Sequence, residues 1–225
     1  MGERMLRAKT AKRGPGRPAR LSCEVILEAA LALLEREPRE PLTAARIAAE
    51  VHAVPAALYR HFANLDELID GVLGKVLGTV ELDIRRRAPW PAQVRDWMTS
   101  LRDHLLRYPA VLPLIGRRGR TSPAWLDVAA VQIGILERAG LSGAQLARAH
   151  LWIIETTMGV VMQEASLSLP DQIENARASL AEMSAEGRAH FAPLVPHLVK
   201  LDGETFFAFV ADRTIEALVA LVEKR

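Results

Sequence analysis

The chain of 225 residues has one cysteine, Cys23, few aromatic residues and no long uninterrupted apolar stretch. A single cysteine excludes an intramolecular disulfide and fits a reducing compartment, so we expect a cytoplasmic protein. No apolar run reaches the roughly 18 residues that a membrane-spanning helix needs. The basic N-terminus is not followed by the apolar stretch of a signal peptide, so we expect no membrane partner.

Signatures of enzymes are also missing from the sequence. The six histidines are scattered, and none belongs to an H-E-x-x-H zinc motif. The sequence contains no G-x-S-x-G element, phosphate-binding loop or dinucleotide fingerprint. We therefore expect no catalytic residues, no metal site and no cofactor, and we predict that the protein is not an enzyme.

Charge and proline are concentrated at the N-terminus. Residues 1–20 hold seven Lys and Arg against one Glu, a balance of +6, which leaves −4 for the rest of a chain with net charge +2. Gly and Pro interrupt this stretch and no apolar face is visible, so we predict a disordered basic arm over 1–20. Two interpretations of Arg17, within Gly16-Arg17-Pro18, stay open. The arginine inserts into a narrow minor groove, or the arm only adds non-specific attraction to phosphates.

The stretch 43–62, TAARIAAEVHAVPAALYRHF, has the pattern of two short helices joined by a tight turn. Thr43 can cap the first helix. Pro55 suits the first turn of the second, because proline lacks the N–H that would be unpaired there. Leu58 and Phe62 then fall on one side of a second helix, which we expect to span 55–62. The pattern predicts a helix-turn-helix whose second helix enters the DNA major groove, with a generic helical hairpin as the alternative.

The segment LYRHFANLDELID, preceded by TAARIAAEV, closely resembles the DNA-binding domain of the tetracycline-repressor (TetR) family of bacterial regulators. The resemblance runs from about Arg20 to Leu77. It implies an all-α fold, with an N-terminal three-helix helix-turn-helix DNA-binding domain and a C-terminal helical ligand-binding and dimerisation domain. The corresponding boundaries are 21–65 for the DNA-binding domain and 66–225 for the connector helix with the ligand-binding and dimerisation domain.

The resemblance and the helical pattern together nominate a set of DNA-contacting residues. The set consists of Arg17, Thr43, Arg46, His52, Val54, Pro55, Ala56, Ala57, Tyr59, Arg60, His61 and Asn64.

Four positions in this region depart from the family pattern. Glycine is usual where His52 stands, so we expect a positive φ there. A polar cap, a Thr or Ser and a phosphate-binding lysine are usual where Val54, Ala57 and Leu65 stand. Whether these three substitutions weaken DNA binding stays open, since alkyl side chains can still contact thymine methyl groups.

A connector helix should follow the second helix of this motif. Asn64 with Glu67 resembles a capping box, and the apolar face continues to Val80, so we expect a helix that ends at the arginines 85–87. Gly71, Gly74 and Gly78 recur along it at helical spacing. They indicate either close helix packing or a pliable connector between the two domains.

The remaining sequence predicts further helices. Ser122-Pro123 marks a helix start and Gly140 a helix end, and we expect long apolar helices near 142–166 and 204–224. The resemblance implies that these two helices pair with their copies in a homodimer.

We expect an apolar effector cavity among the helices near 92–107, 123–139 and 142–166. Glu155 and His104 are the expected polar anchors, with a cationic effector group near Glu155. Met and Trp stripes at helical spacing are, however, more often plain core than the wall of a ligand site. The candidate wall residues are Trp97, Met98, Leu101, His104, Leu105, Trp125, Trp152, Glu155, Met158 and Met162.

These observations predict a ligand-responsive, DNA-binding transcriptional regulator. We expect a repressor, with double-stranded operator DNA and a small hydrophobic or aromatic effector as partners. The effector would release the repressor from a palindromic operator. The alternative is a small-molecule-binding or interaction protein of the same fold whose operator binding is weak or lost.

Overall fold

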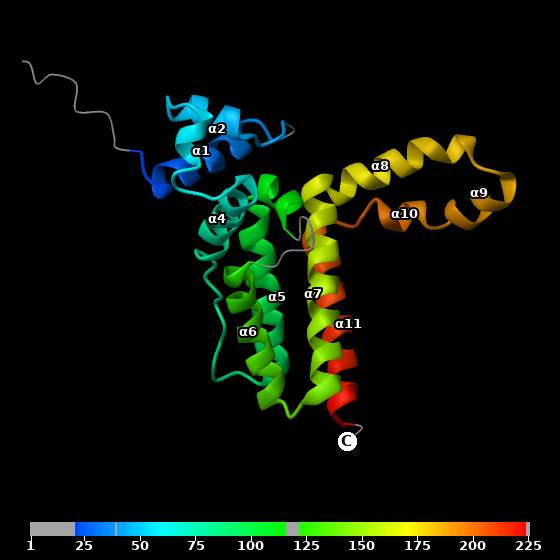
Figure 1. The fold of residues 1–225 in the computed structure, drawn as a ribbon. Helices are drawn as coiled ribbons and strands as arrows, with labels where there is room; N and C mark the ends of the chain where they lie inside the picture. The colour runs from blue at the N-terminus through cyan, green and yellow to red at the C-terminus, as the bar shows by residue number, and fades with distance from the viewer. Residues whose placement is uncertain (1–20, 39, 116–121, 224–225) are drawn as a thin grey trace, which may run out of the picture.

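The computed structural model describes residues 21–38, 40–115 and 122–223, and all regular elements in these ranges are helices (Figure 1). The N-terminal arm with Arg17 and the basic loop 116–121 lie outside the described residues. In the part that is described, no helix combines the length and the apolar character that crossing a membrane requires. The elements are α1 (Cys23–Arg36), α2 (Ala44–Glu50), α3 (Pro55–Leu58), α4 (Leu65–Leu77), α5 (Trp90–Leu106), η1 (Pro109–Leu114), α6 (Pro123–Arg138), α7 (Gly143–Ser166), α8 (Leu169–Ser179), η3 (Leu180–Glu182), α9 (Ala185–Phe191), α10 (Val195–Leu198) and α11 (Gly203–Glu223).

A first hydrophobic core joins α1, α2, α3 and α4. The buried stripe of α1 includes Ile26 and Ala30, and it packs with Ile47 of α2 and Leu58 of α3. The apolar face of α4 belongs to this core as far as Val76. The helices α1 to α3 therefore pack onto most of α4, while the domain boundary at 65/66 stays a prediction.

A second core fills the bundle of α5, α6, α7 and α11, which lie alongside one another below the first unit in Figure 1. Trp97 of α5 is at its centre and is fully buried. The indole N–H of Trp97 donates to the carbonyl oxygen of Val128 at 3.0 Å, so its only polar atom is satisfied. α5 is thereby tied to α6 in the middle of the bundle.

The expected connector helix is shorter than the sequence pattern indicated. α4 ends at Leu77, and the chain from 79 to 88, which we call the linker, is irregular. The arginines 85–87 therefore do not end a helix; Arg85 instead binds Asp96 of α5, with nitrogen–oxygen distances from 2.7 to 3.1 Å. The reason is a change of period, because Leu82 and Ile84 alternate and pack against the second core as an extended segment does.

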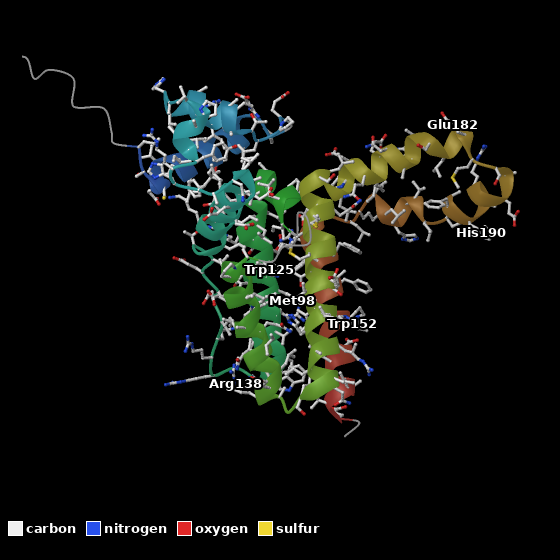
Figure 2. All side chains as sticks on the ribbon, viewed as in Figure 1. Met98, Trp125, Arg138, Trp152, Glu182 and His190 are labelled. Carbon is white, nitrogen blue, oxygen red and sulfur yellow. The ribbon has the colours of Figure 1, made fainter. Side chains whose placement is uncertain are left out.

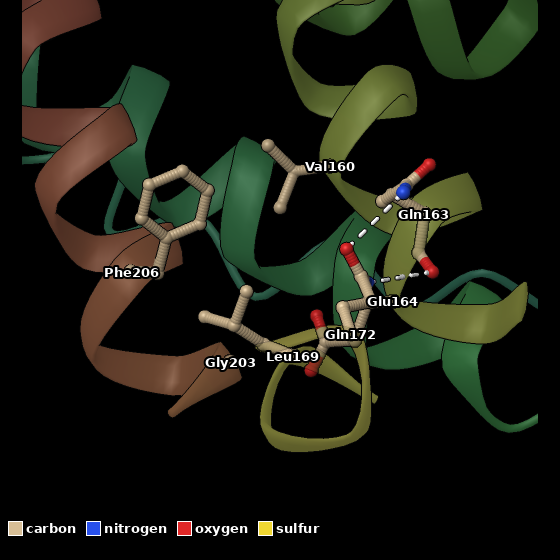
Figure 3. Close-up of a pocket in the computed structure, with 7 residues that line it drawn as sticks. All are labelled: Val160, Gln163, Glu164, Leu169, Gln172, Gly203 and Phe206. Carbon is tan, nitrogen blue, oxygen red and sulfur yellow. Dashed lines mark hydrogen bonds between the residues drawn. The ribbon is translucent and has the colours of Figure 1, made fainter. Parts of the chain in front are cut away.

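Residues 169–201, the helical extension, leave the bundle between α7 and α11 and project to one side (Figure 1). Only Ile173 is buried within this range. At its base, a cavity of about 70 Å³ is lined by residues of α7, α8 and α11 (Figure 3). The carboxylate of Glu164 beside this cavity accepts two hydrogen bonds from Arg102 of α5, at 2.9 and 2.7 Å, so the base is anchored to the bundle.

Candidate DNA-binding surface and effector site

The turn between α2 and α3 has the hydrogen-bonding pattern of a Schellman motif. The N–H of Ala53 donates to Ala48 at 2.8 Å, and the N–H of His52 donates to Ala49 at 3.1 Å. His52 has φ +53°, which confirms the positive φ expected from the family pattern. The histidine thus occupies the left-handed position that usually takes glycine.

The second helix of the motif presents an apolar, exposed start. Val54 is 66% exposed, and Pro55 and Ala56 are exposed beside it. α3 ends at Leu58, four residues before the predicted end at 62, because the following residues continue mainly through tight turn hydrogen bonds. Leu58 and Phe62 are buried and hold this segment against α1 and α4.

The remaining candidates on this surface differ in their availability. Tyr59 is 48% exposed and Arg60 is exposed, whereas His61 and Ala57 are half-buried. Thr43 is exposed and caps α2, with its hydroxyl accepting from the N–H of Arg46 at 3.3 Å. Hydrogen-bond donors such as Tyr59 and Arg60 therefore lie on the same surface as the apolar start of α3.

The side chain of Arg46 makes contacts within the protein, so its charge is not free to bind a DNA phosphate. Its guanidinium pairs with the carboxylate of Glu37 and donates to the carbonyl of Pro41 at 2.6 Å. Asn64 caps α4, its side-chain oxygen accepting from the N–H of Glu67 at 2.9 Å. The Glu67 carboxylate in turn accepts from the N–H of Ala63, so the predicted capping box is confirmed with its return bond one residue earlier than expected.

His104 links α4 to the helical bundle. Its Nε2 lies 2.8 Å from the carbonyl oxygen of Val76 in α4, and its Nδ1 lies 3.2 Å from Arg107. Because a guanidinium can only donate, Nδ1 accepts and Nε2–H donates, which makes the imidazole neutral. Burial lowers the pKa of His104, the hydrogen bond to Val76 opposes this, and the charge of Arg107 lowers the pKa further. The side chain is a bridge between helices, and both ring nitrogens are already engaged.

The candidate effector residues divide into a buried group and an exposed group. Trp97, Met98, Leu101, Leu105 and Met158 are buried with His104 in the second core, and Trp125 is half-buried at its edge; Figure 2 labels Met98 and Trp125.

Three of the predicted wall residues lie on the outer surface of the bundle instead. Trp152 is 55% exposed, Met162 is 45% exposed and Glu155 is exposed, so none of them lines the interior of the bundle. Glu155 needs no buried partner for the same reason. A nearly all-apolar helix carries no signal for which face turns inward, and here the inward face of α7 is that of Ile153, Thr157 and Val161.

Two buried polar side chains inside the bundle were absent from the candidate set. The amide nitrogen of Gln132 on α6 and the hydroxyl of Thr157 on α7 are buried without a hydrogen-bond partner among the described residues. The amide oxygen of Gln132 is engaged, lying 2.8 Å from Nδ1 of His150. An unpaired buried polar group costs about 1–3 kcal/mol, so each of these atoms calls for a partner. The sequence signal was a polar residue at an inward position of an amphipathic helix.

Both parts of the chain match one family of proteins. Residues 26–72 match the family described as "Bacterial regulatory proteins, tetR family". Residues 86–221 match "Tetracyclin repressor-like, C-terminal domain". The chain belongs to the TetR family. Its proteins are transcriptional regulators with a helix-turn-helix, so the all-α architecture and the DNA-binding class predicted from the sequence are confirmed.

Relatives and solved structures extend the match over most of this TetR-family chain. An HTH-type transcriptional regulator of Saccharopolyspora erythraea is 26% identical over 200 residues, covering 89% of this chain and 84% of the relative. The Streptomyces coelicolor TetR family protein ActR, in complex with (S)-DNPA, has a TM-score of 0.74 at 24% identity, covering 91% of this chain and all of ActR. BioQ, a protein of Mycobacterium smegmatis, has a structure with its double-stranded DNA operator that gives a TM-score of 0.60 at 24% identity, covering 81% of this chain and all of BioQ. The structural matches establish the fold.

The TetR-family bundle also exposes an apolar face on α7 and α11. Leu151 and Trp152 of α7 are each more than half exposed, as is Phe209 of α11. Figure 2 shows Trp152 pointing away from the bundle. A hollow of about 290 Å³ lies next to Trp152, and its lining includes Trp152 of α7 together with Ala217 and Leu221 of α11. Large exposed apolar side chains beside such a hollow are typical of a protein–protein interface.

Proposed function

We propose that this protein is a homodimeric repressor that leaves a palindromic operator when a small hydrophobic or aromatic effector binds. The observation that carries the proposal is the exposed start of α3, Val54 to Ala56, held on the buried anchors Leu58 and Phe62. Such a segment can approach base edges and thymine methyl groups, and the exposed Tyr59 and Arg60 would contact the DNA backbone.

The exposed face of α7 and α11 supports the dimer. A two-fold axis through this face would place two copies of α3 on one side of the assembly. Helix-turn-helix dimers bind half-sites about 34–36 Å apart, one helical turn of DNA. A palindromic operator follows from this symmetry.

The unpaired polar atoms of Gln132 and Thr157 support an effector site inside the bundle. Buried aromatic and Met side chains, Trp97 and Met98 among them, would surround an apolar effector body, and the two polar groups would bind a carbonyl or hydroxyl on it. The cationic effector group expected beside Glu155 is not part of this proposal, because Glu155 lies on the outer surface. In the ActR structure the bound molecule is (S)-DNPA, a small-molecule ligand.

A conservative substitution tests the effector site without knowledge of the effector. Thr157→Val keeps the shape of the side chain and removes the unpaired hydroxyl, so we expect the free protein to gain on the order of 1 kcal/mol in its free energy of unfolding. Thr157→Ser is the matched control, because it keeps the hydroxyl and loses a core methyl group. Urea unfolding measures both; a Thr157→Val protein less stable than the wild type would show that the hydroxyl has a partner.

Two observations favour a second candidate function, a small-molecule-binding protein of the same fold with weak operator binding. Arg46 is engaged with Glu37 and Pro41, and Leu65 stands where the family pattern has a lysine. Both features reduce the positive charge available to phosphates.

A band-shift assay on the DNA upstream of the protein's own coding region separates the two candidates. For the repressor we expect retardation at low salt without added ligand. Because Arg60 would contact a phosphate, Arg60→Ala should weaken binding about uniformly across DNA sequences and reduce the salt slope by about 1. Arg177→Ala, at an exposed arginine on the helical extension, should leave binding unchanged. Failure of the wild-type protein to bind at low salt favours the second candidate.

A further inference from the structure

A groove of about 520 Å³ lies on the side of the bundle where the linker passes α6. Leu82 and Ile84 of the linker form one wall, and the other is formed by α6. The α6 wall consists of Ala130, Val131, Gly134, Ile135 and Arg138. Ala130 and Gly134 are small and leave the space open between these walls. The volume falls within the roughly 300–1,000 Å³ typical of small-molecule sites.

The groove lies on a different face of α6 from the proposed effector site. Gln132 points toward His150 of α7, whereas Gly134 and Arg138 face the linker. Gln132 and Gly134 are two positions apart, a rotation of about 200° along a helix, so they lie on nearly opposite faces of α6. A molecule in the groove would therefore touch neither Thr157 nor the amide of Gln132.

The charged groups of the groove are all positive. Arg86 and Arg138 line it, and the lining contains no acidic residue. Arg85 next to them is neutralised by Asp96. Among the described residues, Arg86 has no acidic partner, and the bond of Arg138 is to the neutral amide of Gln93 at 3.2 Å. Arg86 and Arg138 therefore give the groove two positive charges, and its lining holds no acidic counter-charge.

Gln93 organises this end of the groove. Its side chain is 7% exposed, and its amide nitrogen donates to the carbonyls of Arg86 and Ala88 at 3.3 and 2.8 Å. The amide oxygen accepts from Arg138. One buried amide thus fixes the backbone that carries Arg86 and orients the guanidinium of Arg138, so the cationic end of the groove is a built feature (Figure 2 labels Arg138).

We propose that the linker groove binds an amphipathic carboxylate, a molecule with one carboxylate group and a short hydrocarbon or aromatic body. The carboxylate pairs with Arg86 and Arg138, which suit it because guanidinium groups bind carboxylates through two parallel hydrogen bonds. The body lies against Leu82, Ile84 and Val131. The linker continues directly from α4, so an occupied groove holds the segment that joins the DNA-binding unit to the bundle. The site requires neither DNA binding nor the proposed effector site.

Calorimetric titration with octanoate tests the site, with octanamide as the neutral probe of the same length. We expect octanoate to bind the full-length protein and octanamide to bind at least about tenfold more weakly. The double variant Arg86→Gln with Arg138→Gln should weaken octanoate binding at least about tenfold. Val131→Glu, at a position 42% exposed, places a carboxylate in the groove and should have the same effect.

Two variants serve as controls. Arg87→Gln removes an exposed arginine that does not line the groove and should leave octanoate binding unchanged. Thr157→Val should also leave it unchanged, because Thr157 lies in the other site. Equal binding of octanoate and octanamide overturns the proposal, as does a loss in Arg87→Gln equal to that in the double variant. A loss confined to Thr157→Val places octanoate in the bundle interior and likewise overturns it.

Discussion

His52 closes the Schellman turn between α2 and α3 from a conformation that favours glycine. A non-glycine residue in the left-handed region loses about 1–2 kcal/mol. We therefore expect His52→Gly to raise the free energy of unfolding by about 1 kcal/mol and His52→Val, which is branched at Cβ, to lower it. Urea unfolding at constant slope measures both variants. A His52→Gly protein no more stable than the wild type would mean that the histidine side chain makes a compensating contact.

The lowered pKa of His104 leads us to expect a pH-dependent stability. Its pKa in the folded protein is lowered by burial, and that of His150 is lowered by the same cause. At pH values between the lowered pKa of the folded protein and the unfolded value of about 6.5, the unfolded chain binds more protons than the folded one. The stabilisation contributed by the neutral rings is therefore complete above pH ~6.5 and is lost as the pH falls below it.

Thermal unfolding at about pH 7.5 and about pH 5.5 measures this effect. The wild-type melting temperature should fall on acidification, and the fall should be smaller in His104→Gln. His190→Gln, at an exposed histidine on the helical extension, is the control and should behave as the wild type does. An acid-induced fall of the same size in His104→Gln would exclude His104 as its source.

At the scale of elements, the helix starts were predictable because they depend on local chemistry. Ser22, Thr43, Asn64 and Ser122 each cap a helix through their own side chains, as their residue types indicate. The end of α4 was not predictable, because an apolar face of period 3.6 continues to Val80 in the sequence. The helix ends at Leu77 because the following chain packs Leu82 and Ile84 against the bundle, which is a tertiary effect.

The candidate sites were predictable to different degrees. The positive φ of His52 follows from a family pattern at one position, and the buried anchors of α3 follow from helical spacing. The orientation of α7 does not, because both of its faces are apolar. Trp152 and Met158, six positions apart on α7, are both large apolar residues, yet Trp152 is exposed and Met158 is buried. Only the packing against α5, α6 and α11 decides between them.

Two glycines of α4, Gly71 and Gly74, differ in how closely other helices pack against them. A Cβ at Gly71 would lie 2.8 Å from a methyl carbon of Leu27 in α1, whereas a Cβ at Gly74 would have no neighbour within 4 Å. Close packing therefore explains Gly71 and leaves Gly74 without a packing role. We expect Gly74→Ala to raise the free energy of unfolding by about 1 kcal/mol and Gly71→Ala to gain less or to lose stability. Urea unfolding compares them, and equal gains would show that Leu27 moves aside freely.

For the whole molecule, the exposed face of α7 and α11 decides whether the chain acts alone or in pairs. Trp152→Asp puts a charge in the middle of that face, so we expect the protein to become monomeric and to lose its band shift. Leu126→Asp is the matched control, because Leu126 is 57% exposed on α6, away from this face. Size-exclusion chromatography with light scattering measures the mass. A wild-type protein that is already monomeric would contradict the proposed dimer and, with it, the palindromic operator.

The helical extension is a stretch of the chain that lies outside the packed core, while the helices on either side of it pack within the same core. Residues 169–201 bury little, whereas α7 before them and α11 after them share one core and are further joined through Arg102, which pairs with Glu164 and lies 5.0 Å from the ring centre of Phe207. A protease that nicks the extension would therefore yield two fragments that remain assembled. In the same way, a tag or reporter spliced into its tip, near Glu182, would travel with the protein without entering the bundle.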